Sequence, residues 1–478
     1  MADTIRLGTE VILPTMDPHI KTAGPFQTTF RAVFNSLFLG AAGGRSVPGL
    51  ARSARVVEPT VWEFELQPDV RFHDGEPFTA ETVRWNLERA TNPENKLGVQ
   101  VLVQGYVDAE VVDPLTLRVR TSHPDPIFPE RMRLVQIVPQ AYFEKVGAEE
   151  FGRRPSGTGM WRFVSLEDGV FVGESNPDSW QGAPPVQRLE MHALPPEERV
   201  ERLLAGELDI ADRLPATSVA ELEGEGFNVH RHIAGQTSGV FFDLFQDSPV
   251  QDVRVRQALN LAFDNQEAID AVSAGIGLAV GQVGYPDATG WDPTIAPWPH
   301  DPDRARALMA EAGYPDGFQI SMHVLGGAGR LASVDMAERL QSAWREVLGV
   351  DVTLDVLSAE EGLTRQFRGS FHPMRLATRG YGDDVALAQQ IFAYDTPVLI
   401  EPRRYRNDEF DAHYKAAAFE MDPERRVAAL QAGARVLHED AAMVFIGNEA
   451  TIVAASPSVK GLSMESGFYY FWNRISKS

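Results

Sequence analysis

Residues 68–89 read P-D-V-R-F-H-D-G-E-P-F-T-A-E-T-V-R-W-N-L-E-R, and this stretch decides the fold. It follows a strand pattern that ends with Trp62–Leu66, and it turns at Asp74-Gly75, where glycine permits a positive φ. Beyond the turn, apolar residues recur at spacings of three and four: Ala80, Val83, Leu87 and Ala90. This spacing is typical of one buried helical stripe. The stretch therefore predicts a strand, a turn and a helix without a reactive group.

Three later segments have the same kind of patterned order. They are G-T-G-M-W at residues 157–161, D-V-R-V-R-Q-A-L-N at 252–260, and D-P-D-R-A through A-G-Y at 301–314. Together with the opening stretch they resemble the signature of the large solute-binding proteins of ABC importers, family 5, the peptide, dipeptide, oligopeptide and nickel type. Met160 stands where that family usually has proline. The resemblance covers about residues 5–474 and concerns the scaffold, so it leaves the solute open.

The resemblance implies the fold class and the domains. We expect an α/β, periplasmic-binding-protein-like fold with two hinged lobes, of type II and of the large class with an extra inserted domain. Lobe I would comprise residues 1–40, 155–236 and 449–478, the inserted domain residues 41–154, and lobe II residues 237–448. The chain would cross between lobes near residues 237 and 448, so that both ends share one lobe.

Helical patterns dominate after residue 240. Capping and periodicity predict helices over residues 252–271, 301–312, 332–347 and 422–438. The last of these has Asp422 as its expected N-cap and Pro423 in the first turn.

Composition narrows the class of partner. The 478 residues include 67 acidic and 44 basic side chains, a net charge of −23, which argues against nucleic acid as a ligand. The charge favours a cationic or zwitterionic small solute, although it also serves solubility alone. Cysteine is absent, which excludes disulfides, thiolate nucleophiles and cysteine-ligated zinc.

The ends of the sequence bear on localisation. No run approaches about 20 apolar residues, the length that spans a membrane, and the first residues enter a strand pattern directly. If the resemblance holds, we expect a mature form that begins with an added Met and from which the signal peptide is absent. The protein would then be periplasmic, or extracellular and lipid-anchored.

Catalytic motifs are missing from the sequence. It has no G-x-S-x-G, S-x-x-K, H-E-x-x-H or phosphate-loop pattern. The glycine-rich residues 326–330 have the composition of a mobile loop, or of a backbone nest for an anion. His230 and His232 would share one face of a strand and could chelate a divalent ion, but no carboxylate lies nearby in sequence. We expect no enzyme activity, no metal and no cofactor.

Arg131 and Arg133 are one candidate ligand-binding pair. The nickel-chelator members of the family suggest an arginine in this neighbourhood that reaches the cleft, where a guanidinium can hold a carboxylate through two hydrogen bonds. The alternative is a solvated pair on a loop.

The stretch Arg375–Asp384 is the strongest candidate. In the family's peptide binders an aspartate that follows a tryptophan pairs with the ligand's α-ammonium, and here Tyr381 stands near the tryptophan position, with Asp383 or Asp384 near the aspartate. Arg379 lies in the same stretch. A buried ammonium needs a paired carboxylate, because desolvation without one is costly. The alternative is that one aspartate is only the N-cap of a helix over residues 385–392.

Five further residues complete the predicted ligand set. Thr15 and His19 lie in a loop that the family places at the mouth of the cleft. Phe26, Trp161 and Tyr394 are candidate cleft aromatics, with core packing as the alternative for each.

These observations favour a monomeric binding protein. It would capture a peptide or similar small solute between two lobes, close about its hinge, and deliver the solute to an ABC permease in the membrane. A nickel chelate or another small carboxylated solute is the alternative ligand. A cleft hydrolase that uses Asp383 and Asp384 is the alternative from another class, but adjacent residues on a strand point apart and cannot easily flank one bond.

Overall fold

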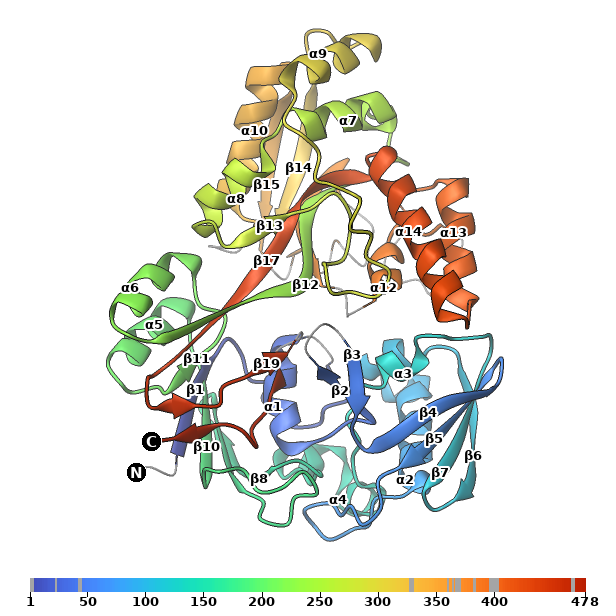
Figure 1. The fold of residues 1–478 in the computed structure, drawn as a ribbon, viewed down its shortest axis with the longest axis vertical. Coiled ribbons are helices and arrows are strands. Elements are labelled where there is room, and N and C mark those ends of the chain that lie inside the picture. Colours follow the sequence, from blue (N-terminus) through green and yellow to red (C-terminus); the bar gives the residue numbers. More distant parts are fainter. Residues whose placement is uncertain are drawn as a thin grey trace. The chain divides into compact units, whose positions relative to one another are not determined.

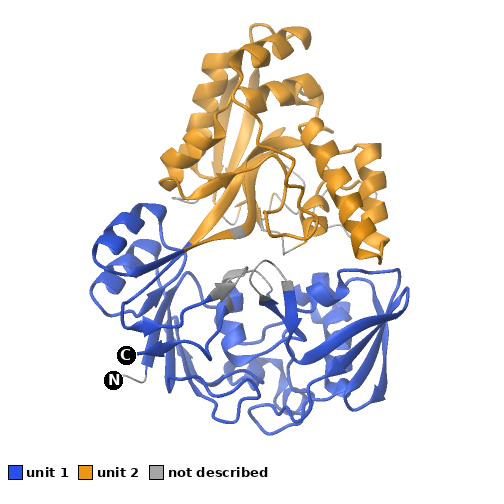
Figure 2. Cartoon of the chain, viewed as in Figure 1, with its two compact units in different colours: residues 1–230, 452–478 blue, residues 231–451 orange. Residues whose placement is uncertain are grey.

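The computed structural model describes residues 4–21, 24–41, 45–325, 331–358, 361–362, 365, 371–380, 384–394, 404–465 and 469–478. The chain forms two compact units (Figure 2): unit 1 comprises residues 1–230 and 452–478, and unit 2 comprises residues 231–451. Both chain ends therefore belong to unit 1. Two long strands, β12 (Asn228–Phe242) and β17 (Met443–Ala455), carry the chain from one unit to the other. The three-part domain scheme from the sequence stays a prediction.

Unit 1 is built on two sheets. In the first, β1 (Thr4–Thr9) runs parallel to β10 (Arg188–Ala193) and to β11 (Ile210–Ala211). This sheet continues through β9 (Val170–Ser175) and β8 (Trp161–Glu167), and the last residues of β17 pair with β11. The second sheet has the order β4 (Ala51–Glu58), β5 (Val61–Leu66), β7 (Thr116–Thr121), β6 (Tyr106–Asp113).

Short strands and helices complete unit 1. The strands are β2 (Phe38–Ala41), β3 (Arg45–Pro48), β18 (Val459–Lys460), β19 (Met464–Glu465), β20 (Tyr469–Tyr470) and β21 (Ser476–Lys477). The helices of its described part are α1 (Gly24–Val33), α2 (Ala80–Thr91), α3 (Phe128–Arg131), α4 (Gln140–Arg153), α5 (Pro196–Leu204) and α6 (Val219–Gly224).

The opening sequence stretch forms the predicted strand, turn and helix. Strand β5 leads to a turn in which Gly75 has φ 95°, and helix α2 begins after Thr79, whose hydroxyl accepts from the Thr82 N–H. The predicted apolar stripe of α2 is buried. It packs with the second sheet in a core of its own, separate from the core around β1 and Trp161. The prediction for this stretch is confirmed.

In its described residues, unit 2 contributes a row of five neighbouring strands to a larger sheet, with helices on both faces (Figure 1). The strand order is β15 (Asp351–Leu357), β14 (Gln319–Leu325), β16 (Met374–Gly380), β12 and β17, and β14 is parallel to both of its neighbours. A short strand, β13 (Gly277–Ala279), pairs with β17.

Side chains of alternate residues in the central strands pack into two hydrophobic cores, one on each face of the sheet. On one face Met322, Met374 and Leu376 pack with the helices α7 (Val253–Leu261), α8 (Asn265–Ser273), α9 (Pro302–Glu311) and α10 (Val334–Leu348). On the other, Phe241 and Ala377 pack with α12 (Val385–Gln389), α13 (Asp408–Phe419) and α14 (Pro423–Glu439). Within the described residues, no helix is both long and apolar enough to cross a membrane.

The helices predicted after residue 240 form, with one correction. The segment over residues 252–271 is two helices, because Asp264 accepts from the Glu267 N–H and begins α8 as a new helix. An aspartate side chain competes with the helical backbone for N–H groups, so it favours a helix start over a helix interior.

The C-terminal segment packs into unit 1. Trp472 meets Trp161 edge to face, with ring centres 6.0 Å apart, and both side chains are buried. The Lys477 ammonium lies 2.7 Å from an oxygen of Asp209, whose other oxygen accepts from the Arg6 N–H at 2.8 Å. The last residues therefore help to hold the first strand in place.

Candidate functional site

The carboxyl ends of the parallel strands β14 and β16 are the candidate site in unit 2. In open α/β sheets, ligands bind beyond the carboxyl ends of the strands. The predicted stretch Arg375–Asp384 runs along β16 and past its end. Side chains at this edge therefore decide what chemistry unit 2 can offer to a solute.

Glu449 on β17 is held firmly at this edge. Its Oε1 accepts from the Leu331 N–H at 2.9 Å and from the hydroxyls of Thr378 and Ser238 at 3.0 and 3.1 Å. The side chain is half-buried. Hydrogen bonds to one oxygen fix the carboxylate group, so Glu449 is an oriented negative charge of the kind that suits an ammonium group. The sequence analysis missed it, because a lone glutamate in a strand carries no motif.

Asn448 precedes Glu449 and points to the other face of the strand. Its side-chain amide donates to the carbonyl oxygens of Gln236 and Gly284, both at 2.8 Å, and contacts the Thr237 hydroxyl at 3.2 Å. The side chain is fully buried. Asn448 thus joins β12 to β17 close to the residues where the chain passes between the units.

Arginines line the opposite face of β16 from Thr378. Arg375 is buried, with its guanidinium carbon 5.4 Å from the ring centre of Phe241 and 4.5 Å from that of Phe371. The guanidinium carbon of Arg379 lies 5.9 Å from the Phe241 ring centre, and that of Arg404 lies 4.8 Å from the Phe371 ring centre. Stacking on aromatic rings fixes a guanidinium while its N–H edges keep their direction. Arg379, a predicted ligand residue, therefore belongs to a cationic row.

The carboxylate of Asp384, also predicted as a ligand residue, makes structural contacts within unit 2. Its two oxygens accept from Arg426 at 2.7 and 2.8 Å, and Oδ1 also accepts from the Ala386 N–H at 2.8 Å as the N-cap of α12. The carboxylate is buried. The alternative that we set beside its ligand role, an N-cap, is present. Tyr381 and Asp383 lie outside the described residues, as do residues 326–330.

Arg131 and Arg133 lie in unit 1, where Arg133 is buried and the Arg131 side chain is 11% exposed, in contrast to the solvated pair that was the alternative. Arg131 forms an ion pair with Asp125 and donates to the carbonyls of Leu102 and Gln104 at 2.9 and 3.1 Å. Arg133 lies 3.4 Å from Glu130. These contacts give both arginines a structural role, and their ligand role stays a prediction.

Thr15 and His19 belong to a hydrogen-bonded loop of unit 1. The Thr15 hydroxyl accepts from the Asp17 N–H at 3.3 Å, and Asp17 lies 2.6 Å from Arg89. His19 is fully buried, with Nε2 donating to the Gln136 carbonyl at 2.7 Å and Nδ1 facing Arg89. Burial, with the Arg89 charge, lowers the pKa of His19 to about 4. The ring is therefore neutral at neutral pH.

The three predicted cleft aromatics differ in their surroundings. Trp161 is fully buried against Trp472 in the core of unit 1, and Phe26 is half-buried against the same core. Tyr394 in unit 2 lies 5.9 Å from Phe245, measured between ring centres. Only Tyr394 lies in the same unit as the Arg375–Asp384 stretch.

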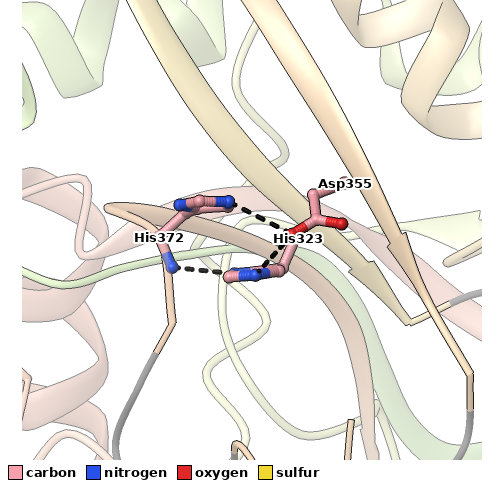
Figure 3. Close-up of side chains that lie close together, drawn as sticks. All are labelled: His323, Asp355 and His372. Atoms are coloured by element: carbon pink, nitrogen blue, oxygen red, sulfur yellow. Dashed lines mark hydrogen bonds and ion pairs between the residues drawn. The ribbon is translucent and has the colours of Figure 1, made fainter. Parts of the chain in front are cut away.

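One cluster of possible metal ligands stands out in the described chain, and it consists of His323, Asp355 and His372 (Figure 3). It does not include His230 or His232, the pair that the sequence suggested. The three residues come from β14, β15 and the segment before β16, so their spacing along the chain forms no motif that would predict the cluster.

Comparison with known proteins identifies the class. The model of the bacterial extracellular solute-binding proteins, family 5, matches residues 45–396, and the chain belongs to this family. The expected family and the α/β fold of the periplasmic-binding-protein type are confirmed. The matches give the hydrolase alternative no support.

The individual proteins that match share less than 30% sequence identity with this chain. The chain is 28% identical to the glutathione-binding protein GsiB of Pectobacterium atrosepticum, over 64% of this chain and 61% of that protein. It thus spans less than two thirds of that relative's length. It is 26% identical to the di/tripeptide-binding protein 2 of Pseudomonas aeruginosa, over 96% of this chain and 92% of that protein. Among solved structures, the ABC transporter substrate-binding protein CtaP of Listeria monocytogenes matches with a TM-score of 0.88 at 18% identity, over 99% of each chain.

Proposed function

We propose that this protein binds a short peptide and delivers it to the permease of an ABC importer. The family match over residues 45–396 carries the proposal, and relatives named for glutathione and for di- and tripeptides favour a peptide among the possible solutes. Glutathione is itself a tripeptide. These named solutes share an ammonium group, carboxylate groups and amide bonds.

The charges at the strand ends of unit 2 suit such a zwitterion. The fixed carboxylate of Glu449 offers a partner for an ammonium, and Arg379, next to the last residue of β16, offers a partner for a carboxylate. Of the two predicted aspartates, we propose Asp383 as the partner of the α-ammonium, because the carboxylate of Asp384 is already paired with Arg426.

The proposed mechanism is binding without bond chemistry. A solute that binds one conformation more tightly shifts the protein towards it, and the permease then receives the loaded form. We therefore expect the solute to be recovered intact after long incubation. The protein would act outside the cytoplasmic membrane, in keeping with its membership of a family of extracellular solute-binding proteins.

Native mass spectrometry of the purified protein, followed by calorimetry with the recovered solute, tests the proposal. We expect a peptide, and we expect its N-acetylated form to bind at least about tenfold more weakly, because removal of one partner of a buried charge pair costs about 2–5 kcal/mol. Asp383→Asn should cause a similar loss, as should an alanine substitution of Arg131 or of Arg133 if either reaches the ligand. Recovery of a non-peptide solute, with no binding of any peptide, would contradict the proposal.

A further inference from the structure

The strand register of unit 2 brings two imidazoles and a carboxylate together. His323 on β14 stands opposite Asp355 on β15, and His372 lies two residues before the start of β16. Asp355 Oδ2 lies 3.0 Å from His323 Nε2 and 3.3 Å from His372 Nε2 (Figure 3). All three residues belong to unit 2, so the cluster is complete within one unit.

We propose that His323, Asp355 and His372 form a binding site for a divalent transition-metal ion. Imidazole and carboxylate ligands together suit zinc, nickel and copper. Two ligand atoms bound tetrahedrally at about 2.0–2.1 Å from zinc are separated by about 3.3 Å. The separations of Asp355 Oδ2 from the two Nε2 atoms are close to this value, so both imidazoles lie within reach of an ion bound to Asp355. The proposal is independent of the peptide-binding function.

His323 is the fixed ligand of the site. Its side chain is only 1% exposed, and the His372 N–H donates to its Nδ1 at 2.8 Å. Nδ1 therefore carries no proton while this hydrogen bond is made, and Nε2 faces both Asp355 Oδ2 and Arg365 Nη1.

Metal binding requires two local changes. The rings of His323 and His372 are stacked 3.8 Å apart at 13°, and two parallel planes cannot both contain one ion. His372, with its side chain 36% exposed, is the ring with room to turn. An ion bound to His323 Nε2 leaves the proton of the neutral ring on Nδ1, so the hydrogen bond from the His372 N–H to Nδ1 breaks. The first change turns the His372 ring, and the second removes its backbone hydrogen bond.

The guanidinium of Arg365 lies where it would compete with a bound metal ion for His323 and Asp355. Its Nη1 lies 2.8 Å from His323 Nε2 and 3.9 Å from Asp355 Oδ2. A divalent ion beside Nε2 must displace this guanidinium, because like charges at such distances repel. Removal of the Arg365 charge should therefore tighten metal binding, a result that a purely structural His–Asp–His cluster would not give.

Calorimetric titration of the full, tag-free, chelator-treated protein with zinc alone and with nickel alone tests the proposal at neutral pH. We expect one ion per chain for wild type and a loss of at least about tenfold for His372→Ala and for Asp355→Asn. His300→Ala, which removes an exposed histidine of the same unit, is the matched control and should leave the affinity unchanged. Circular dichroism checks that each variant is folded.

Two further measurements separate a built site from weak surface binding. Arg365→Gln should bind zinc several-fold more tightly than wild type. Nitrogen-15 spectra should show the zinc-bound His323 ring with its proton on Nδ1, and the His372 amide signal should shift when zinc is added. The proposal is overturned if wild type binds neither ion saturably, if His372→Ala binds like wild type, or if the Arg365→Gln affinity and the His372 amide signal stay unchanged.

Discussion

Asp384 and Arg426 form a buried ion pair with two hydrogen bonds, of 2.7 and 2.8 Å, between residues 42 positions apart in the chain. The side chains are 6% and 7% exposed. The same carboxylate caps α12, so one group fixes both the start of that helix and its attachment to α14. Removal of either partner would leave a charge in a desolvated place.

Asp384→Ala should lower the free energy of unfolding by about 3–5 kcal/mol, because it leaves the Arg426 charge buried and unpaired. Urea denaturation followed by circular dichroism measures the change. The control is Asp408→Ala, which removes an exposed partner of Arg406 and should leave the denaturation midpoint nearly unchanged. Equal midpoints for Asp384→Ala and the control would show that the buried pair does not stabilise unit 2.

Trp472 should be a main anchor of the C-terminal segment. Trp472→Ala should cost about 3–5 kcal/mol in unfolding free energy, because it leaves a cavity beside Trp161 in the core of unit 1. A double-mutant cycle with Trp161→Ala should give a coupling energy of about 0.5–1.5 kcal/mol for the edge-to-face contact. The exposed Phe245→Ala serves as the control, and a coupling of zero would rule out a specific ring contact.

Acid should destabilise unit 1 through two neutral histidines, His19, which is fully buried, and His73, which is half-buried. Burial is the main cause that lowers the pKa of both His19 and His73 to about 4, from 6.5. In the unfolded chain each ring takes up a proton near pH 6.5, while the folded protein resists until about pH 4. Their contribution to stability is therefore fully present above pH 6.5 and is lost as the pH falls through this window.

The expected loss is roughly 2–3 kcal/mol per histidine between pH 6.5 and about 4.5. Urea denaturation at several pH values measures it. His73→Gln should reduce the slope of unfolding free energy against pH in this window, whatever its effect at neutral pH. His300→Gln, at an exposed site, should keep the wild-type slope. A slope in His73→Gln as steep as that of wild type would contradict the assignment.

Asn448→Ala should destabilise the junction of β12 and β17. The substitution removes the side-chain donor to the Gln236 carbonyl and one donor to the Gly284 carbonyl, which keeps the Thr237 hydroxyl, at a cost of about 1–3 kcal/mol. Hydrogen exchange should quicken at residues 236–240 and 446–450, and urea denaturation gives the free energy. Asn95→Ala, which removes an exposed amide, is the control and should change neither measurement.

The sequence predicted the strand, turn and helix of residues 61–91 correctly, because each depends on local chemistry: a positive φ at Gly75, a hydroxyl cap at Thr79 and an apolar stripe on one helical face. It was wrong about one helix over residues 252–271, although the signal was present. Aspartate is a residue type that favours the N-cap, so Asp264 indicated the start of a second helix. The prediction rested on apolar periodicity alone and took no account of this residue.

The sequence by itself determined the family, the α/β class and most helix boundaries, since these rest on residue order within one element and its neighbours. Only the tertiary structure decided how individual charges are used. It paired Asp384 with Arg426, fixed Glu449 through Leu331, Ser238 and Thr378, and gathered the cluster of His323, Asp355 and His372. Such contacts depend on strand register and on packing between distant segments. The spacing of residues along the chain predicts neither the strand register nor this packing.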